Sequence, residues 1–427
     1  MDKGKIRCDF LSAIVIALLA SANSLFAERI ATLGERPNWS SLNAFQDTIT
    51  KEDFTRELTR VYAPNHSYRH YITILADSAL IRTSLASKEI FKLRFSTLET
   101  AAKPVPRYWR PASEMPEPPL SKPLEGVKIA LDPGHIGGKW AKMEERWFQI
   151  GSRIPVLEGD MTLLVARKLK RKLEAMGAKV SMIRDDTKPV TKTRPANLRK
   201  EALEELRKRG VKKIRKSYSG ETDPFKTTSI QWQSELLFYR ISEIRERGKI
   251  VNEEVKPDLV VALHFNAESW GDPANPTLVD ENHLHLIVNG TYSQGELSYD
   301  DVRFEMLLKL LGQTAPEAIA MSDAVAVSMR KSMNLPPYIY TGRNATRVGE
   351  TGYVWSRNLL ANRIYRCPVI YLEPYVMNSR EVFERIELGD YEGTREVNGK
   401  VRKSIFEEYA ESVSQGLGRY FLDARRN

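Results

Sequence analysis

From residue 125 onward, short apolar runs alternate with segments of helical periodicity, and this alternation narrows the possible folds more than any other feature. Between the first two apolar runs, apolar side chains recur every three or four residues from Met161 to Met176, as on one face of a helix. Such alternation predicts an α/β domain with a mainly parallel sheet flanked by helices on both faces. The predicted strands are short and aliphatic, and they span residues 127–131, 178–183, 258–263, 283–288 and 368–372.

The chain before residue 125 divides into three parts. Residues 1–22 combine a basic start, an apolar run and a small-x-small site, which is the layout of a cleavable secretory signal. Residues 23–101 mix helix and strand signals and predict a small α+β region, to which the sequence assigns no role. Residues 102–124 contain seven prolines and predict an extended linker, because proline fixes φ and removes a backbone donor.

The predicted α/β domain therefore comprises residues 125–427. Two segments within it break the alternation of strands and helices. The first, near 187–235, is rich in charged residues and predicted to be helical, and the second, near 291–315, includes an amphipathic stretch. Interruptions this long in a compact α/β domain are usually functional or inserted. We interpret both as insertions.

The secretory signal and the net charge restrict the possible partners. After cleavage no remaining run approaches the ~20 apolar residues of a membrane helix, so we expect no membrane span. The expected location is periplasmic or extracellular. A formal net charge of +10 favours anionic partners. Export argues against nucleic acid as one of them.

Potential metal ligands stand where the predicted strands end. The first strand runs into a turn that holds His135, a later strand ends at His264, and the last ends at Glu373. Glu158 lies just before the first long helix. In open α/β sheets, ligand groups gather at the carboxyl edge of the strands, so we expect these four side chains at one edge.

Two imidazoles and one carboxylate with an open fourth position are typical of a catalytic zinc site. Bound zinc lowers the pKa of water to about 7 and polarises a carbonyl. A second carboxylate is then needed to move protons, and Glu373 suits that role. Taken alone, each residue also has a structural interpretation: the histidines as hydrogen-bonded strand ends, Glu158 as a carboxylate stabilised by the helix dipole, and Glu373 as an ion-pair partner.

Four stretches resemble, in the same order, the zinc-dependent N-acetylmuramoyl-L-alanine amidases of the amidase-3 type. The family's first strand and Asp-Pro-Gly-His-Gly-Gly turn correspond to IALDPGHIGG, and its metal glutamate with the following helix corresponds to LEGDMTLLVARKLKRKLEAMGAKV. Its Arg-Asn-strand pattern corresponds to RGKIVNEEVKPDLVVALHFNA, and its catalytic-glutamate strand to VIYLEPYVMNSRE. The resemblance spans about 60% of the chain.

The resemblance implies a role for each candidate residue. His135, Glu158 and His264 would hold Zn²⁺, and Glu373 would be the general base and acid. The implied reaction is hydrolysis of peptidoglycan between N-acetylmuramic acid and the L-alanine of the stem peptide. Some family members carry an inserted helix that covers the site until an activator removes it, so an activator protein is a candidate partner.

This chain departs from the family's pattern at three places. Ile136 is inserted into the His-Gly-Gly run, and the loop from His135 to Glu158 is several residues longer than usual. Pro374, Tyr375 and Val376 follow Glu373 where the family commonly has a small residue, Gly and Phe. Two other functions therefore stay open. One is a zinc peptidase acting on the stem peptide, and the other is a catalytically silent wall-binding regulator.

Five further residues each allow two interpretations. His283 and His285 lie two apart on one strand face, and exposed positions on an edge strand are favoured over a place in the pocket. Asn266 either positions substrate or caps a turn. Trp140 and Trp147 either stack on sugar rings or cover a core.

Overall fold

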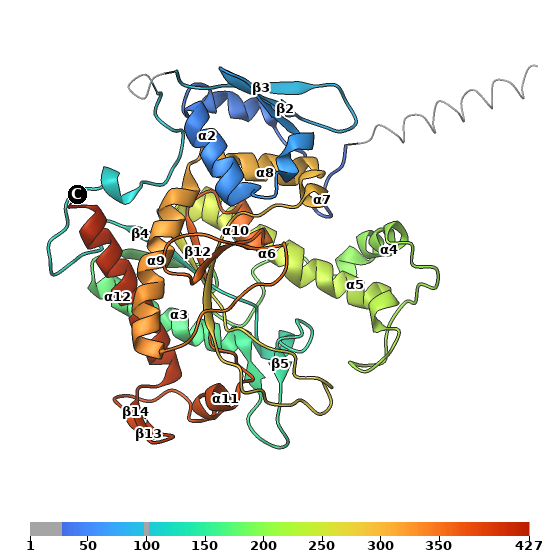
Figure 1. Ribbon diagram of the computed structural model, residues 1–427. Helices are drawn as coiled ribbons and strands as arrows, with labels where there is room; N and C mark the ends of the chain where they lie inside the picture. Colours follow the sequence, from blue (N-terminus) through green and yellow to red (C-terminus); the bar gives the residue numbers. More distant parts are fainter. Residues whose placement is uncertain (1–27, 98–101, 427) are drawn as a thin grey trace, which may run out of the picture.

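The computed structural model describes residues 28–97 and 102–426, and Figure 1 shows how their helices and strands are arranged. The predicted secretory signal at residues 1–22 lies outside the described residues.

A seven-stranded sheet forms the centre of the molecule, with the order β10-β11-β9-β12-β8-β4-β7. Neighbours are parallel except in two pairs, β9 with β12 and β10 with β11. The mainly parallel sheet predicted from the sequence is therefore confirmed. Its strands are β4 (Lys128–Pro133), β7 (Lys179–Met182), β8 (Leu259–Leu263), β9 (Leu284–Val288), β10 (Thr346–Arg347), β11 (Val354–Ser356) and β12 (Val369–Pro374).

Helices cover both faces of this sheet, as expected from the uninterrupted apolar character of its strands. Ile129 and Leu131 of β4 pack with one group of helices, whereas Ala130 between them packs with the other. The first group is α3 (Glu158–Ala175), α9 (Thr314–Met333) and α12 (Ile405–Ala424). The second is α6 (Glu243–Lys249), its π-helical continuation η11 (Ile250–Val255) and α10 (Leu360–Ile364).

The N-terminal region is a small antiparallel sheet with short helices. Its elements are the 3₁₀ helix η2 (Trp39–Phe45), α2 (Lys51–Glu57), the π-helical turn η3 (Leu58–Tyr62), β1 (Ile72–Ile74), β2 (Ser78–Arg82) and β3 (Ile90–Arg94).

The insertion predicted near 291–315 forms α7 (Gln294–Leu297) and α8 (Asp300–Leu311). In Figure 1 both helices lie beside the N-terminal elements. Leu307 and Leu310 of α8 are fully buried in one hydrophobic cluster with Phe54 and Leu58. This insertion therefore completes the core of the N-terminal region.

The insertion predicted near 187–235 forms α4 (Arg199–Lys208) and α5 (Ile230–Leu237), which project from the body of the molecule in Figure 1. Helix α5 continues through the π-helical segment η10 (Phe238–Ser242) into α6, which packs on the sheet. The insertion is thus joined to the sheet domain by a continuous run of helix.

Several short elements complete the described fold. They are the 3₁₀ turns η4 (Ser67–His70), η6 (Ala112–Glu114), η7 (Gly138–Trp140), η8 (Pro195–Leu198) and η9 (Lys226–Thr228), the helix α11 (Arg380–Glu387), and the strands β5 (Trp147–Phe148), β6 (Val156–Leu157), β13 (Arg395–Val397) and β14 (Lys400–Arg402).

The proline-rich segment at residues 102–124 packs against the sheet domain. Trp109 is 2% exposed and belongs to the same hydrophobic cluster as Ala130 of β4 and Val260 of β8. Arg110 forms an ion pair with Asp258 at 2.7 Å. None of the helices among the described residues has the length and apolar character needed to cross a membrane.

The shared core predicts that α8 stabilises the N-terminal region. Leu307→Ala should lower the free energy of unfolding by about 2–5 kcal/mol, because it leaves a cavity among fully buried side chains. The matched control is Leu308→Ala, which truncates a partly buried neighbour on the same helix and should cost less. Denaturant unfolding of both variants measures the difference. Equal losses would contradict this role for Leu307.

Candidate functional site

The sheet order brings the four candidate residues to one edge. Strands β12, β8 and β4 are consecutive neighbours in the sheet. His135 follows β4, His264 follows β8, and Glu373 is on β12 near its carboxyl end. Glu158 is the first residue of α3, whose N-terminus faces the same edge. The crossovers between parallel strands therefore assemble a site from residues that are far apart in sequence.

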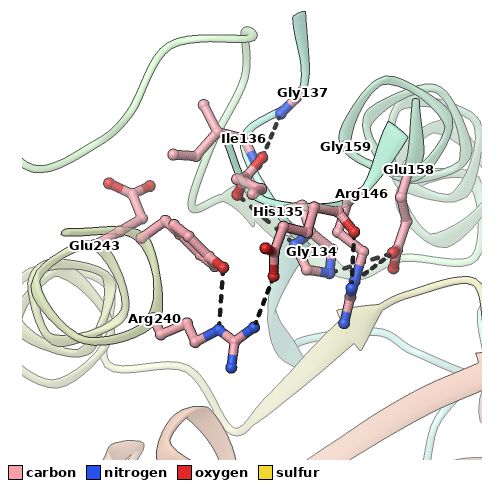
Figure 2. Close-up of polar contacts among 12 residues, drawn as sticks. Gly134, His135, Ile136, Gly137, Arg146, Glu158, Gly159, Arg240 and Glu243 are labelled. Carbon is pink, nitrogen blue, oxygen red and sulfur yellow. Dashed lines mark hydrogen bonds and ion pairs between the residues drawn. The ribbon is translucent and has the colours of Figure 1, made fainter. Parts of the chain in front are cut away.

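His135, Glu158 and His264 lie close enough to share one metal ion. Each offers a ligand atom, and these atoms all lie within 4.8 Å of one another. Nε2 of His135 is 3.3 Å from one Glu158 carboxylate oxygen, and Nδ1 of His264 is 3.1 Å from the other. Two imidazoles and a carboxylate form a donor set that suits zinc, so the residues fit the expected ion. Figure 2 shows His135 and Glu158 facing one another.

The turn that carries His135 depends on a glycine. A Cβ on Gly134 would lie 2.2 Å from Cε1 of the His264 ring, so only glycine lets His135 and His264 approach one another. The Gly134 amide donates to the Leu263 carbonyl at 2.8 Å, which ties the turn to the end of β8. His135 itself has a φ of 59°, an unusual value for a residue with a side chain.

Two buried arginines, Arg247 and Arg184, donate hydrogen bonds to this turn and to the start of α3. Arg247 of α6 donates to Asp132 Oδ1 at 2.8 Å, to the Pro133 carbonyl at 2.8 Å and to the His135 carbonyl at 2.9 Å. Arg184 donates to the Gly159 carbonyl at 2.9 Å in the first turn of α3. The His135 turn and the Glu158 helix start are therefore fixed by neighbouring cations.

A carboxylate unnoticed in the sequence, Glu144, lies behind His135. It is 2% exposed, and one of its oxygens lies 3.7 Å from His135 Nδ1. It accepts hydrogen bonds from the amides of Ile136 at 2.9 Å and Gly137 at 3.1 Å, so the inserted Ile136 supplies one of its donors. With Glu144 on the Nδ1 side, His135 directs Nε2 toward Glu158. A carboxylate on the far side of an imidazole in this way orients the ring, and such a carboxylate would also support the ring as a metal ligand.

The carboxyl groups of the site influence one another's protonation. Burial raises the pKa of Glu158, but the two imidazoles outweigh burial and hold it well below its usual range. Burial and the neighbouring Glu158 raise the pKa of Glu373 well above its usual value, against the opposing charge of Arg146. The two carboxylates thus differ in proton affinity, as expected for a ligand and a proton carrier.

Arg146 is a second residue that the sequence did not identify. Its Nε lies 3.3 Å from the Glu158 carboxylate, and its charge also acts on Glu373. Figure 2 shows Arg146 beside Glu158. Arg146 belongs to the charged run Glu144-Glu145-Arg146 in the long loop between His135 and Glu158. That run is the feature of the sequence that could have pointed to Arg146.

A cavity of about 400 Å³ opens over the cluster of His135, Glu158 and His264. Glu373 lies in its wall together with Arg146 and Tyr371, and the Tyr371 ring stacks on the His264 imidazole with centroids 4.3 Å apart. The remaining wall comes largely from the segment after β8, residues 265–271, which includes Asn266 and Trp270. No lining residue comes from 187–235 or 291–315, so neither insertion covers the cavity in the described part of the chain.

The structure accommodates Pro374, Tyr375 and Val376, which depart from the family's pattern after Glu373, through contacts of Tyr375. Tyr375 stands where the family commonly has glycine, and its φ is 58°. Its hydroxyl donates to Glu408 at 2.7 Å, and its carbonyl accepts from the Asn266 amide at 2.8 Å. Anchored at both ends, this tyrosine holds a backbone conformation that otherwise favours glycine.

The favoured interpretation of His283 and His285 is wrong. Strand β9 lies inside the sheet between β11 and β12, and the two histidines are 8% and 3% exposed. His283 contacts Glu268 at 3.2 Å, and His285 contacts the Tyr340 hydroxyl at 3.0 Å. The long connections around β9 concealed its central place from sequence analysis.

The remaining open alternatives resolve as follows. The Asn266 side chain accepts a hydrogen bond from the Ala267 amide at 2.8 Å, as expected for a turn cap, and the residue also lines the cavity. Trp140 packs against Phe238 with ring centroids 5.3 Å apart, in a small core that also contains Ile136. The Lys142 ammonium nitrogen lies over the Trp147 ring, 4.1 Å from its centroid.

Because Gly134 lies against the His264 ring, a methyl group added at residue 134 should disturb the spacing of His135 and His264. Gly134→Ala should weaken zinc binding roughly tenfold or more, because the new Cβ displaces the His264 ring. The control is Gly295→Ala, where a Cβ meets only an ordinary contact at 3.9 Å. Calorimetric zinc titration compares the two variants with the parent protein. Unchanged affinity in Gly134→Ala would show that the histidine spacing does not matter.

Comparison with known proteins gives one family and a set of structures. The family described as N-acetylmuramoyl-L-alanine amidase (Amidase_3) matches residues 129–394. No curated protein matches the chain.

Among solved structures, the chain is similar to the N-acetylmuramoyl-L-alanine amidase AmiC2 of Nostoc punctiforme, with 15% identity, 70% of this chain and 98% of that chain covered, and a TM-score of 0.35. It is similar to the catalytic domain of the amidase CwlV from Bacillus (Paenibacillus) polymyxa var. colistinus, with 14% identity, coverage of 70% and 99%, and a TM-score of 0.35. The CwlD amidase from Clostridioides difficile, solved in complex with the GerS lipoprotein, shows 13% identity, coverage of 69% and 98%, and a TM-score of 0.36.

Proposed function

The chain belongs to the N-acetylmuramoyl-L-alanine amidase family, and we propose that it hydrolyses the amide bond between N-acetylmuramic acid and L-alanine in peptidoglycan with the help of zinc. The observation that supports this most directly is the convergence of His135, Glu158 and His264 beneath a cavity whose wall contains Glu373. A metal-binding cluster beside a separate carboxyl group is the arrangement that metal-assisted amide hydrolysis requires.

His135, Glu158 and His264 would hold the zinc ion. Zinc bound there would lower the pKa of a water molecule and polarise the carbonyl of the scissile amide. Glu144 and Arg247 contribute by fixing His135, through contacts to its ring and to its carbonyl oxygen. Their positions limit the movement of the imidazole, which keeps the ligand set preorganised.

Glu373 would carry the proton during the reaction. A carboxylate in this role accepts a proton from the attacking water and returns it to the nitrogen of the leaving L-alanine. Burial and the neighbouring Glu158 raise its pKa above the usual glutamate value, which makes it a stronger proton acceptor.

The substrate would lie in the cavity with its scissile amide between Glu373 and the metal-binding cluster. Asn266 and Trp270 border the same space and would contact the muramoyl or peptide portions. We propose that the protein acts outside the cytoplasmic membrane, in the periplasm or beyond, because its substrate is in the wall and residues 1–22 match a secretory signal. An activator protein remains a prediction, since neither insertion lines the cavity.

Replacing the proton carrier should separate catalysis from metal binding. Glu373→Gln should lower the rate of peptide release about 10²–10⁴-fold, because the amide cannot accept the proton of the attacking water. Zinc content should stay at the parent level, since Glu373 is not one of the three ligands. His135→Ala is the matched comparison and should lose zinc and activity together. Parent rates in Glu373→Gln would contradict the assigned role.

The raised pKa of Glu373 also predicts how pH affects stability. In metal-free protein, ionising this half-buried carboxyl costs stability. The cost begins above the ordinary glutamate pKa and grows as pH rises toward the raised folded-state value. Glu373→Gln removes the cost, so its Tm should exceed that of the parent by roughly 2 °C more at pH 8 than at pH 5. Calorimetric unfolding with a chelator measures this gap, and a gap independent of pH would contradict the raised pKa.

A further inference from the structure

The projecting insertion ends in a dense group of basic residues. Between residues 207 and 216, at the end of α4 and in the turn that follows it, seven of the ten residues are basic and none is acidic. All seven side chains are exposed. We call this group the tip patch, and it consists of Arg207, Lys208, Arg209, Lys212, Lys213, Arg215 and Lys216.

Backbone hydrogen bonds hold the tip patch in a fixed shape. The Arg215 amide donates to the Thr228 carbonyl at 3.1 Å, and the Ile230 amide donates to the Arg215 carbonyl at 2.9 Å. The Arg215 guanidinium lies over the Phe225 ring at 3.7 Å from its centroid. The turn therefore lies against the segment that leads into α5, and its charges are held together.

The charge of the tip patch is largely uncompensated. Lys208 pairs with Glu205 at 3.2 Å, and Arg209 bonds to the uncharged Gln233 at 3.0 Å. Lys212, Lys213 and Lys216 form no ion pair with any carboxylate of the described residues. Clustered cations without partners repel one another and produce a strongly positive potential, which an anionic partner relieves.

The segment that supports the tip patch also contacts the rim of the cavity. Lys226 and Trp232 both bond to one oxygen of Glu145, at 3.0 Å and 3.2 Å. Glu145 lines the cavity beside Arg146, and Arg240 approaches it at 3.6 Å. Figure 2 shows Arg240 and Arg146 in the same view of the site. These contacts join the insertion that carries the tip patch to the cavity wall.

We propose that the tip patch binds the anionic wall polymer itself, through the carboxylates of stem peptides that neighbour the one in the cavity. This inference rests on the proposed function, because it takes peptidoglycan as the polymer being cut. A polymer with repeated carboxylates matches a row of fixed cations, and the link through Glu145 keeps the two binding places at a constant spacing.

A lipid surface fits the tip patch less well. Phe225, at 47% exposure, is the one large hydrophobic residue classed as exposed between residues 207 and 230, and the Arg215 guanidinium covers its ring. Surfaces that enter membranes present a broader apolar face beside their basic residues. The tip patch instead presents charge alone, which suits an aqueous polyanion.

The test compares two triple variants of the full-length, zinc-loaded protein. K212E/K213E/K216E reverses three charges of the tip patch, and K88E/K331E/K400E reverses three exposed lysines elsewhere with the same change in net charge. Each protein is sedimented with purified sacculi over a range of salt concentrations. Peptide release is measured on sacculi and on a soluble disaccharide-peptide. K212Q/K213Q/K216Q repeats the test without added negative charge.

The tip-patch variants should bind sacculi roughly tenfold more weakly at low salt and digest them correspondingly more slowly, because three cation contacts are lost. Their rate on the soluble disaccharide-peptide should equal the parent rate, since that substrate is too short to reach beyond the cavity. The control triple variant should match the parent in both assays.

Two results would overturn the inference. In the first, the tip-patch variants bind sacculi as tightly as the control triple variant does. In the second, the same variants are sedimented with phosphatidylglycerol vesicles and lose binding to the vesicles while they still bind sacculi, which would assign the tip patch to a lipid surface. Failure of the parent protein to release peptide from either substrate would instead contradict the proposed function, while the sedimentation comparison would still decide the role of the tip patch.

Discussion

The buried guanidinium of Arg247 is the contact on which the architecture of the site depends. Its side chain is 4% exposed and pairs with two carboxylates, Asp132 at the end of β4 and Glu243 one turn earlier on α6. It also donates to the Pro133 and His135 carbonyls in the turn after β4. Removing one member of such a buried network typically costs about 3–5 kcal/mol, because the remaining charges lose their partners. A single cation thus joins strand, turn and helix.

The same network extends to the insertion. Glu243 accepts hydrogen bonds from the amides of Val190 and Thr191, at 3.1 Å and 2.9 Å, where the chain leaves the sheet domain. Together with the continuous helix from α5 to α6, this contact fixes the base of the projecting arm. The insertion can therefore carry binding groups at a defined distance from the cavity, which a flexible loop could not do.

The electrostatics of the site favour a cation at its centre. Glu158 is 1% exposed, Glu144 is 2% exposed and Glu373 lies close by, so three carboxyl groups share a small volume. Arg146 lies on one side of Glu158, with its Nε 3.3 Å from a carboxylate oxygen. Buried carboxylates are costly without partners, and a divalent ion between the imidazoles and Glu158 would supply the missing positive charge.

Much of the fold and the expected ligand set were predictable because they rest on local patterns. Short aliphatic runs identified the strands that carry His135, His264 and Glu373, and the carboxyl-edge rule brought them together. Glu144 and Arg146 were missed because a loop has no periodicity that indicates which side chains turn inward. His283 was misplaced because the position of β9 within the sheet depends on long-range pairing. The partnership of α8 with the N-terminal core was hidden for the same reason.

The measurement that tests this account most directly is mass analysis of the products formed from purified sacculi by the zinc-loaded protein. The account predicts one zinc per chain and whole stem peptides with a free N-terminal L-alanine, released from glycan strands and absent after chelation. Stem peptides that are shortened but still attached to the glycan would contradict it, as would a zinc-loaded protein that releases nothing.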